Sequence, residues 1–299
     1  MSRKILFFIN PISGTKGKIH LEEKIVHACE EKNMAFEIMF TSKEGDYTFL
    51  PDKIDADAIT DIVICGGDGS LSPIISATLK KDVAIGIIPL GSGNGLARTA
   101  GIPHPVDKAL EVILKGKTKR TDAFLVNNNL SCHVCGLGFD AMVAHEFARQ
   151  KKRGLNSYTR LSLKNFFSAR SYSFNIETPE ETFRTDAFLI CIANSNQFGN
   201  NFKIAPSASI SDGLLDIVIL KKTSKPQIIF SFVRQILYGK VSTASSRERD
   251  KKNILYFQTD KIKIENLQSA PFHIDGDPVK TEHHFSIEIL PSAYRLIQP

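Results

Sequence analysis

DIVICGGDGS, residues 61–70, is the stretch of this sequence that decides its fold. Its first half, Asp61-Ile62-Val63-Ile64-Cys65, is almost continuously apolar, which predicts a strand buried on both faces of a parallel sheet. Its second half, Gly66-Gly67-Asp68-Gly69-Ser70, predicts a tight loop that leads into a helix. A buried strand, a glycine loop and a helix in this order are typical of an α/β protein.

The sequence on either side repeats this pattern. Apolar runs predict further strands over residues 4–9, 36–40 and 83–88, and helical spacing predicts helices over residues 19–32 and 71–79 and from Leu96 onward. Strands that alternate with helices indicate a parallel sheet covered by helices. We therefore predict a Rossmann-like nucleotide-binding domain over residues 1–121.

The later sequence predicts mostly strands, and residues 261–265 alternate strictly between polar and apolar side chains. We predict an antiparallel β-sandwich domain over residues 122–289. Helices are expected near residues 158–168 and from Ser224, where a capping-box pattern begins. The predicted strands cover residues 123–126, 172–177, 187–193, 214–220, 254–258, 261–265 and 285–290.

Composition narrows the class of protein. The 299 residues carry 38 basic and 32 acidic side chains, a net charge of +6 that suits an anionic membrane surface or a polyphosphate ligand and does not imply nucleic acid. No apolar run is long enough to span a bilayer, and the N-terminal apolar run is too short for a signal peptide. The odd count of five cysteines predicts reduced, buried thiols, and the lone pair Cys132 and Cys135 lacks the second ligand pair of a zinc site. We expect a cytoplasmic protein.

Three predicted strands of the first domain each end in a loop that contains glycine. The carboxyl ends of parallel strands share one edge of a sheet, and that edge binds ligands. Glycine lets the backbone approach a ligand closely, and backbone N–H groups favour phosphate oxygens. Neither a Walker A loop nor G-x-G-x-x-G is present. The loops are Asn10-Pro11-Ile12-Ser13-Gly14-Thr15-Lys16-Gly17, Gly66-Gly67-Asp68-Gly69-Ser70 and Pro89-Leu90-Gly91-Ser92-Gly93-Asn94-Gly95.

Asp68 stands out because an acidic side chain in a phosphate cradle repels the ligand unless a cation intervenes. Mg²⁺ held by a carboxylate and phosphates removes that conflict. Asp68 is also placed to cap the helix that begins near Leu71, and the two roles can coexist. Near the C-terminus, Asp275-Gly276-Asp277 predicts a hairpin turn, and its second carboxylate is suited to accept the proton of an alcohol during phosphoryl transfer.

These motifs, in this order, resemble the catalytic domain shared by soluble bacterial diacylglycerol kinases, related lipid kinases and sphingosine kinases. The resemblance spans nearly the whole chain. It extends to Gly136-Leu137-Gly138-Phe139-Asp140-Ala141, to Ala205-Pro206 with Ser211-Asp212-Gly213-Leu214-Leu215-Asp216, and to Leu290-Pro291-Ser292-Ala293.

The resemblance implies an ATP- and Mg²⁺-dependent kinase that phosphorylates a hydroxyl of a membrane lipid. It implies that residues 290–299 return to the first domain, that Asp277 and Asp68 are catalytic, and that Ser209, Asp212 and the carbonyl of Leu214 hold a structural Mg²⁺. By the same resemblance, the nucleotide contacts Asn10, Pro11, Ser13, Gly14, Thr41, Gly66, Gly67, Asp68, Gly69, Ser70, Ser72, Gly91, Ser92, Gly93 and Asn94.

The sequence departs from the family pattern at two positions. The family has Glu where this chain has Asp277, which is one methylene shorter, so either the substrate sits closer or activity is poor. Diacylglycerol kinases have Asp where this chain has Gly95, whereas sphingosine-kinase-like members have a small residue there. The Gly95 departure therefore argues against diacylglycerol as the acceptor and favours a sphingoid or other lipid alcohol.

Two charge-rich stretches, residues 149–153 and 247–252, suit weak, reversible docking to an anionic membrane surface. The sequence leaves a homodimer open. Two other functions also remain. An NAD kinase shares the Gly-Gly-Asp-Gly loop, but its Asn-Glu pair is missing and only Asn194-Ser195-Asn196 lies near the expected place. A nucleotide- or lipid-binding regulator that has lost catalysis is the other alternative.

Overall fold

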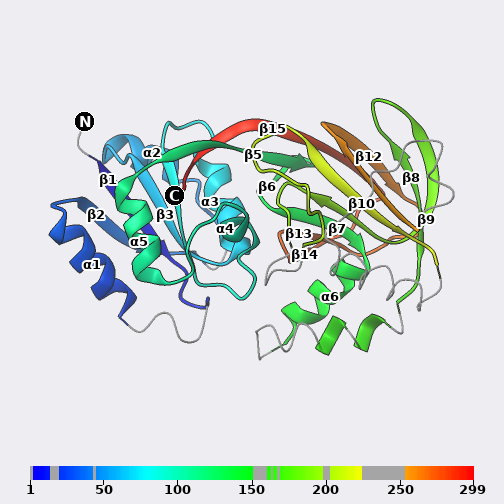
Figure 1. Cartoon of the computed structure of the whole chain (residues 1–299), viewed down its shortest axis with the longest axis horizontal. Coiled ribbons are helices and arrows are strands. Elements are labelled where there is room, and N and C mark those ends of the chain that lie inside the picture. Colours follow the sequence, from blue (N-terminus) through cyan, green and yellow to red (C-terminus); the bar gives the residue numbers. More distant parts are fainter. Residues whose placement is uncertain are drawn as a thin grey trace. The chain divides into compact units, whose positions relative to one another are not determined.

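A computed structural model describes residues 3–13, 20–42, 45–150, 160–162, 164–166, 169–197, 203–223 and 253–299 (Figure 1). The chain divides into two compact units. Unit 1 comprises Met1–Asp122 and Ser292–Pro299, and unit 2 comprises Ala123–Pro291. In the described part of the chain, no helix is both long enough and apolar enough to cross a membrane.

Unit 1 is built on a parallel sheet in the order β2-β1-β3-β4. The predicted parallel α/β arrangement is confirmed, and each predicted strand is present within one residue at either end. The strands are β1 (Lys4–Ile9), β2 (Ala35–Phe40), β3 (Asp61–Gly66) and β4 (Ala84–Pro89). The helices are α1 (Leu21–Glu31), α2 (Leu50–Ala56), α3 (Leu71–Thr78), α4 (Gly95–Thr99) and α5 (Val106–Lys115), with a 3₁₀ turn, η1 (Asp68–Ser70).

The centre of this sheet is buried along its whole length. Every residue of β3 and β4 is buried, as a strand covered on both faces requires. Gly86 of β4 lets α5 approach closely, because a Cβ atom there would lie 3.2 Å from the Ile113 side chain and 3.0 Å from that of Val63. The apolar packing therefore holds the sheet rigid beneath the loops that follow its strands.

Unit 2 is mainly antiparallel, which confirms the predicted β-sandwich class. The main path of its sheet runs β14-β13-β7-β9-β8-β12-β15, and β10 joins β9 to β11. The strands are β6 (Asn129–Ser131), β7 (Val134–Gly138), β8 (Tyr172–Glu177), β9 (Thr182–Ala193), β10 (Leu215–Lys221), β11 (Ile254–Thr259), β12 (Lys261–Asn266), β13 (Phe272–Ile274) and β14 (Asp277–Val279). One helix, α6 (Phe139–Ala148), follows β7 directly.

Strand β9 shows why unit 2 has a core on both faces of its sheet. Successive side chains of a strand point to opposite faces. Ile190 and Ile192 belong to one apolar cluster, while Leu189, Cys191 and Ala193 belong to another. The sheet is therefore buried on both sides at this strand.

Two strands carry the chain between the units: β5 (Thr118–Val126) and β15 (His284–Ile297). β15 is much longer than predicted, because it continues past Pro291 and pairs with β4 through Arg295 and Leu296. Helical residues at 160–162 and 164–166 lie within the helix predicted near residues 158–168. The helix predicted from Ser224 lies outside the described residues. All five cysteines are free and buried, as predicted.

Candidate active site

The second and third glycine loops of unit 1 touch backbone to backbone. A Cβ atom on Gly91 would lie only 2.6 Å from the Cα atom of Gly67, and one on Gly67 would lie 3.1 Å from the Cα atom of Gly91. The Gly66 carbonyl accepts hydrogen bonds from the Leu90 N–H (2.8 Å) and the Gly91 N–H (3.3 Å). Only glycine allows this approach, so the two loops form one backbone surface at the end of β3 and β4.

Asn10 connects the first loop to this surface. Its backbone N–H donates to the Cys65 carbonyl over 3.0 Å, and its side-chain amide donates to the Ser70 hydroxyl over 2.8 Å. Its Oδ1 atom accepts from the Ile12 N–H over 3.0 Å, which shapes the loop that contains Pro11 and Ser13. The described residues of all three loops thus form one hydrogen-bonded assembly, whereas Gly14 lies outside the described residues.

Thr41 follows the neighbouring strand β2 at the same edge. Its N–H donates to the Ile9 carbonyl over 3.0 Å, so it lies beside the start of the first loop. The remaining predicted nucleotide residues lie on the same assembly. Gly69 is in η1, Ser72 is buried in α3, and Ser92 and Gly93 stand in the third loop.

Asp68 does not cap the helix that begins near Leu71, and that prediction is wrong. Its carboxylate instead accepts hydrogen bonds from the Gly95 N–H (3.0 Å) and the Leu96 N–H (3.2 Å), the first two N–H groups of α4. The 3₁₀ turn at residues 68–70 places the side chain toward the third loop and away from α3. A carboxylate offers about four acceptor positions, so two used positions leave room for a cation or its water ligands.

Asn94 presents an unsatisfied polar atom in this assembly. It adopts a left-handed backbone conformation, with φ 53°, and its side-chain amide donates to the Gly91 carbonyl over 2.7 Å. Its Oδ1 atom is buried and has no hydrogen-bond partner among the described residues. A buried acceptor without a donor is costly, and a ligand hydroxyl or a hydrated cation fits this position.

Arg98 and His104 are charged or titratable groups that the sequence reading did not assign. The Arg98 guanidinium donates to the Gly93 carbonyl over 3.1 Å and so holds the third loop. The pKa of His104 is lowered, first by burial and then by Arg98, while Asp68 opposes both effects. The His104 ring therefore lies within electrostatic range of both Arg98 and Asp68.

In unit 2, Asp275-Gly276 forms the predicted hairpin turn. Both residues have positive φ, 51° and 86°, and they join β13 to β14 with Ile274 paired to Asp277. Positive φ at both central residues is typical of the two-residue turn that Asp-Gly favours. The turn places Asp277 at the start of β14, where its side chain is exposed.

The first aspartate of this turn is a buried anchor. The Asp275 carboxylate accepts hydrogen bonds from the Ser131 hydroxyl (2.7 Å) and from the N–H groups of His133 and Val134 (both 3.1 Å). Its own N–H donates to the Val134 carbonyl over 2.8 Å. These bonds tie the turn, and with it Asp277, to the segment that leads into β7.

A buried histidine holds the same turn from another side. The Gly276 N–H donates to Nδ1 of His273 over 3.2 Å, so the proton of the neutral ring is on Nε2. That Nε2 lies 3.3 Å from the Asp140 carboxylate, and both side chains are almost fully buried. Asp140 thus orients His273, which orients the turn before Asp277. The sequence contained both residues within noticed motifs but gave no sign of this contact.

The segment predicted to hold a structural cation, residues 209–214, lies in unit 2. Asp212 accepts hydrogen bonds from the Leu214 N–H over 3.2 Å and from the Gln258 amide over 3.4 Å. The same amide donates to Asp216 over 3.3 Å. Burial raises the pKa of Asp216, and the neighbouring Asp212 adds to that rise. The predicted ligands supply a hydroxyl, a carboxylate and a carbonyl oxygen, which are the ligand types that a hard divalent cation prefers. A cation there would also offset the repulsion between the Asp212 and Asp216 carboxylates.

Each of the two units matches a known protein domain. Residues 4–126 match the diacylglycerol kinase catalytic domain, and residues 133–298 match the YegS C-terminal NAD kinase beta sandwich-like domain. A "Probable lipid kinase YegS-like" from Shewanella frigidimarina is 27% identical over 296 residues, covering 96% of this chain and 92% of the relative. "Probable lipid kinase YegS" from Shigella flexneri is 28% identical over 277 residues, covering 90% of this chain and 88% of that one.

Solved structures share the fold. A crystal structure from Bacillus anthracis str. Sterne matches with a TM-score of 0.79 at 22% identity, covering 99% of this chain and 97% of its own. Another, described as of a diacylglycerol kinase from the same organism, matches with a TM-score of 0.73 at 21% identity over the same fractions. With both domain matches spanning nearly all of its length, the chain belongs to the YegS-like lipid kinase family and joins a diacylglycerol kinase catalytic domain to an NAD kinase-like β-sandwich.

Proposed function

We propose that this protein transfers the γ-phosphate of ATP to a hydroxyl group of a diacylglycerol-like or sphingoid-like membrane lipid, in a reaction that requires Mg²⁺. The observation that carries the proposal is the contact between Gly67 and Gly91, which joins two glycine loops into one backbone surface at the sheet edge. Such a surface suits a polyphosphate, because phosphate oxygens can approach the backbone N–H groups directly.

The residues of unit 1 bind and orient the nucleotide in this proposal. Asn10 and Ser70 fix the first two loops against each other, and Arg98 adds a positive charge at the third loop. Asp68 holds the start of α4 with two acceptor positions and directs the others toward a cation. Mg²⁺, when bound, neutralises phosphate charge and so favours attack on the γ-phosphorus.

Asp277 accepts the proton of the lipid hydroxyl. As the hydroxyl oxygen bonds to the γ-phosphorus, the bond from that phosphorus to the bridging oxygen breaks and ADP leaves. The Asp277 carboxylate takes the released proton. Three groups position it: Asp275 and His273 hold the turn, and Asp140 orients His273. A shorter acid than the family's Glu requires the acceptor hydroxyl to lie closer to the backbone of β14.

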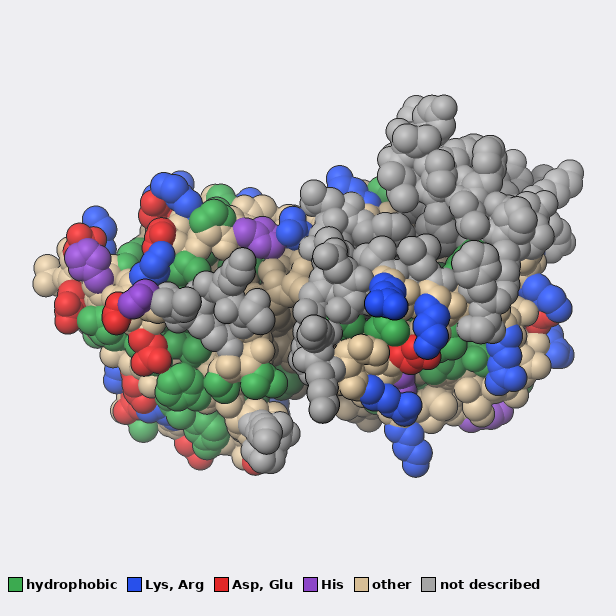
Figure 2. All heavy atoms as spheres, turned by 90° about the horizontal axis from the view of Figure 1, so that it is seen from below, with side chains coloured by type: hydrophobic (Ala, Val, Ile, Leu, Met, Phe, Trp, Pro, Cys, Tyr) green, Lys and Arg blue, Asp and Glu red, His purple; other side chains and the backbone are tan. Residues whose placement is uncertain are grey.

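Charge supports docking of unit 2 to an anionic membrane. Unit 1 has 17 basic and 16 acidic side chains, a net charge of +1, while unit 2 has 21 and 16, a net charge of +5. On the described surface of unit 2 in Figure 2, Lys and Arg side chains are more prominent than Asp and Glu. Arg149 ends α6, whereas residues 151–153 and 247–252 of the two predicted basic stretches lie outside the described residues. Neutralising residues 149–153 should lower binding to anionic vesicles, and unchanged salt-sensitive binding would refute that role.

The activity is tested by phosphate transfer from γ-labelled ATP. Purified protein is incubated with mixed micelles that contain diacylglycerol, sphingosine or extracted membrane lipids, with and without Mg²⁺, and with NAD in a separate reaction. Label is expected in a lipid product and only when Mg²⁺ is present. Label in NAD would favour an NAD kinase, and ATP binding without transfer to any acceptor would favour a regulator that has lost catalysis.

Single substitutions test the two roles proposed for carboxylates: proton acceptance by Asp277 and Mg²⁺ binding by Asp212. Asp277→Asn should lower transfer about 1,000-fold without loss of ATP binding, whereas Asp260→Asn, at an exposed turn aspartate of the same unit, should leave transfer unchanged. Asp212→Ala tests the proposed structural Mg²⁺. It should remove the rise in melting temperature that Mg²⁺ gives to the wild-type protein, since ligand binding to the folded state raises its stability.

A further inference from the structure

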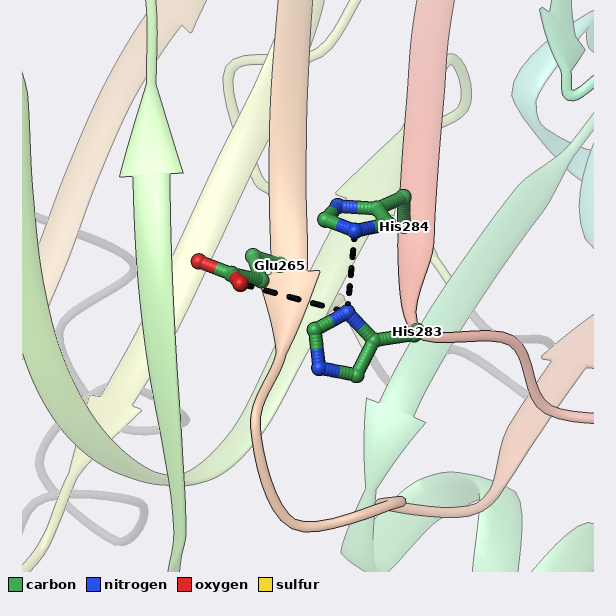
Figure 3. A group of neighbouring side chains, drawn as sticks. All are labelled: Glu265, His283 and His284. Atoms are coloured by element: carbon green, nitrogen blue, oxygen red, sulfur yellow. Dashed lines mark hydrogen bonds and ion pairs between the residues drawn. The ribbon is translucent and has the colours of Figure 1, made fainter.

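A cluster of two histidines and one glutamate contains none of the residues of the candidate active site. In the described part of the chain, Glu265, His283 and His284 form one group whose potential ligand atoms all lie within 4.8 Å of one another (Figure 3). Nδ1 of His283 is 3.0 Å from Nε2 of His284 and 3.9 Å from a Glu265 carboxylate oxygen. The Glu265 side chain is 33% exposed and that of His283 is 56% exposed, so the cluster is open to solvent.

Strand pairing brings these side chains together. Glu265 lies directly opposite His284 in the antiparallel register of β12 and β15. Directly opposed residues have neighbouring side chains on the same face of a sheet. The His283 carbonyl accepts a hydrogen bond from the Asn266 N–H over 2.7 Å, which fixes the backbone of the adjoining residue. Glu265 and His284 are therefore held by strand backbone, and His283 lies at the bend directly before β15.

We propose that Glu265, His283 and His284 bind a divalent transition-metal ion of the zinc class. Around an ion with bonds near 2.1 Å, neighbouring ligand atoms lie roughly 3 to 3.4 Å apart. The two imidazole nitrogens already have this separation, and the carboxylate needs to approach by roughly half an ångström. Two imidazoles and one carboxylate favour Zn²⁺, Ni²⁺ or Cu²⁺ over Mg²⁺, which prefers oxygen ligands. Water fills the open position.

A supporting contact orients the carboxylate. The side-chain amide of Asn175, on β8, donates to the second carboxylate oxygen of Glu265 over 2.5 Å. This leaves the first oxygen directed at His283. Groups that hydrogen-bond to metal ligands in this way fix their orientation and strengthen metal binding.

An ion at this site would stabilise the segment between β12 and β15. Residues 267–283 lie between β12 and β15 and carry β13, β14 and the turn before Asp277. An ion shared by Glu265 and the two histidines cross-links the two strands at the base of this segment. Metal binding here does not depend on the proposed kinase activity.

Three of the five buried cysteines are poor competitors for the ion. Burial raises the pKa of Cys29 to about 11 and raises those of Cys135 and Cys191 further above their usual range. A thiol must lose its proton to bind metal. Protonated thiols at these three positions are therefore poorer zinc ligands at neutral pH than the imidazoles of the cluster.

The test is calorimetric titration of the full chain, without a histidine tag, with ZnCl₂ at neutral pH and with excess MgCl₂ present. We expect one Zn²⁺ per chain with micromolar affinity. His283→Gln and His284→Gln should each weaken binding at least about tenfold, and Asn175→Ala about tenfold. His27→Gln, which removes an exposed histidine beside Glu31 on α1, is the matched control and should bind zinc like the wild type.

X-ray absorption at the zinc edge provides a second readout. Nitrogen and oxygen neighbours with the signature of two imidazoles are expected. A sulfur neighbour, affinity unchanged in both histidine variants, or no stoichiometric binding at about 100 µM zinc would overturn the proposal. Circular dichroism confirms that these surface variants are folded, so weakened binding reports loss of a ligand.

Discussion

The glycine-loop assembly of unit 1 and the Asp275 turn of unit 2 are positioned in opposite ways. The loops are held by backbone contact, with Gly67 against Gly91 and few charged groups. The turn is held by buried charge: the Asp275 carboxylate accepts from the Ser131 hydroxyl and from the N–H groups of residues 132–134, and Asp140 lies beside His273. Backbone N–H groups that face solvent can bind phosphate oxygens directly. An exposed carboxylate is held in place only when the buried groups that support it have all their hydrogen bonds made.

This difference predicts distinct failures. Changes in the loop assembly should act through steric contact, because there is no room for a side chain. Changes at the turn should act through unsatisfied hydrogen bonds, because the donors that face Asp275 are buried. A substitution at Asp277, whose side chain is exposed, should change the rate of the reaction and not the stability of the fold.

Asp277→Asn tests the separation of chemistry from stability. Loss of a proton acceptor should lower lipid phosphorylation about 1,000-fold. The free energy of unfolding should change by less than about 0.5 kcal/mol, because the side chain is exposed. Steady-state kinetics and urea unfolding measure the two quantities. Equal losses of activity and stability would place Asp277 with Asp275 as a structural residue.

Asp275→Ala tests the buried anchor. The variant leaves the N–H groups of His133 and Val134 and the Ser131 hydroxyl without their acceptor, so the free energy of unfolding should fall by about 3 kcal/mol. Urea unfolding measures it, with Asp260→Asn as the control at an exposed aspartate. A change as small as that of the control would show that water replaces the carboxylate.

Gly91→Ala tests the backbone contact between loops. The added Cβ atom would lie 2.6 Å from the Gly67 Cα atom and 2.7 Å from the Asn94 Oδ1 atom, so we expect a loss of about 2 kcal/mol and weaker ATP binding. Gly101→Ala is the control. Its φ of 70° imposes backbone strain of about 1 kcal/mol, but nothing lies within 4 Å of the added atom. Unaltered ATP binding in Gly91→Ala would separate the loop contact from the nucleotide.

Asp68→Ala tests the cap on α4. Loss of the carboxylate that accepts from Gly95 and Leu96 should lower the free energy of unfolding by about 1 kcal/mol. Asp68→Asn retains one acceptor oxygen and should lose less. Chemical denaturation of both variants measures the difference, and identical losses would show that charge, not capping, is what Asp68 contributes to stability.

The smallest effect concerns Asp216. Burial raises the pKa of its carboxyl above the value in the unfolded chain. The folded protein therefore binds this proton more tightly, and the associated stability is fully present at low pH and lost as pH rises through the raised pKa. Asp216→Asn has no such titration, so its stability relative to the wild type should increase from about pH 4 to pH 7. Urea unfolding across this range checks the sign, and a constant difference would contradict it.

Sequence reasoning found much of the candidate site because its signals are local. The apolar run at residues 61–65 and the loop that follows identified β3 and its glycine edge, and Asp275-Gly276 identified the turn. Sequence reasoning assigned Asp68 to the start of α3, whereas its carboxylate binds the start of α4. The true partner, Gly95, lies 27 residues away in the chain, so no local pattern indicated it. Sequence reasoning missed His104 and gave no role to Arg98 or to Asp216, although Asp216 lies in a motif that it noted, because the neighbours of these residues come from other segments. Helix α6 has no clear apolar stripe to predict it.

The sequence by itself determined the parallel and antiparallel classes of the two units, the glycine loops and the family to which the chain belongs. These follow from periodicity, turn chemistry and ordered motifs, which act over a few residues. Only the tertiary structure decided which groups meet: Gly67 with Gly91, Asp275 with Ser131 across 144 positions, and Glu265 with His284. Such contacts are set by strand register and close packing, which bring distant residues together and which no local pattern encodes.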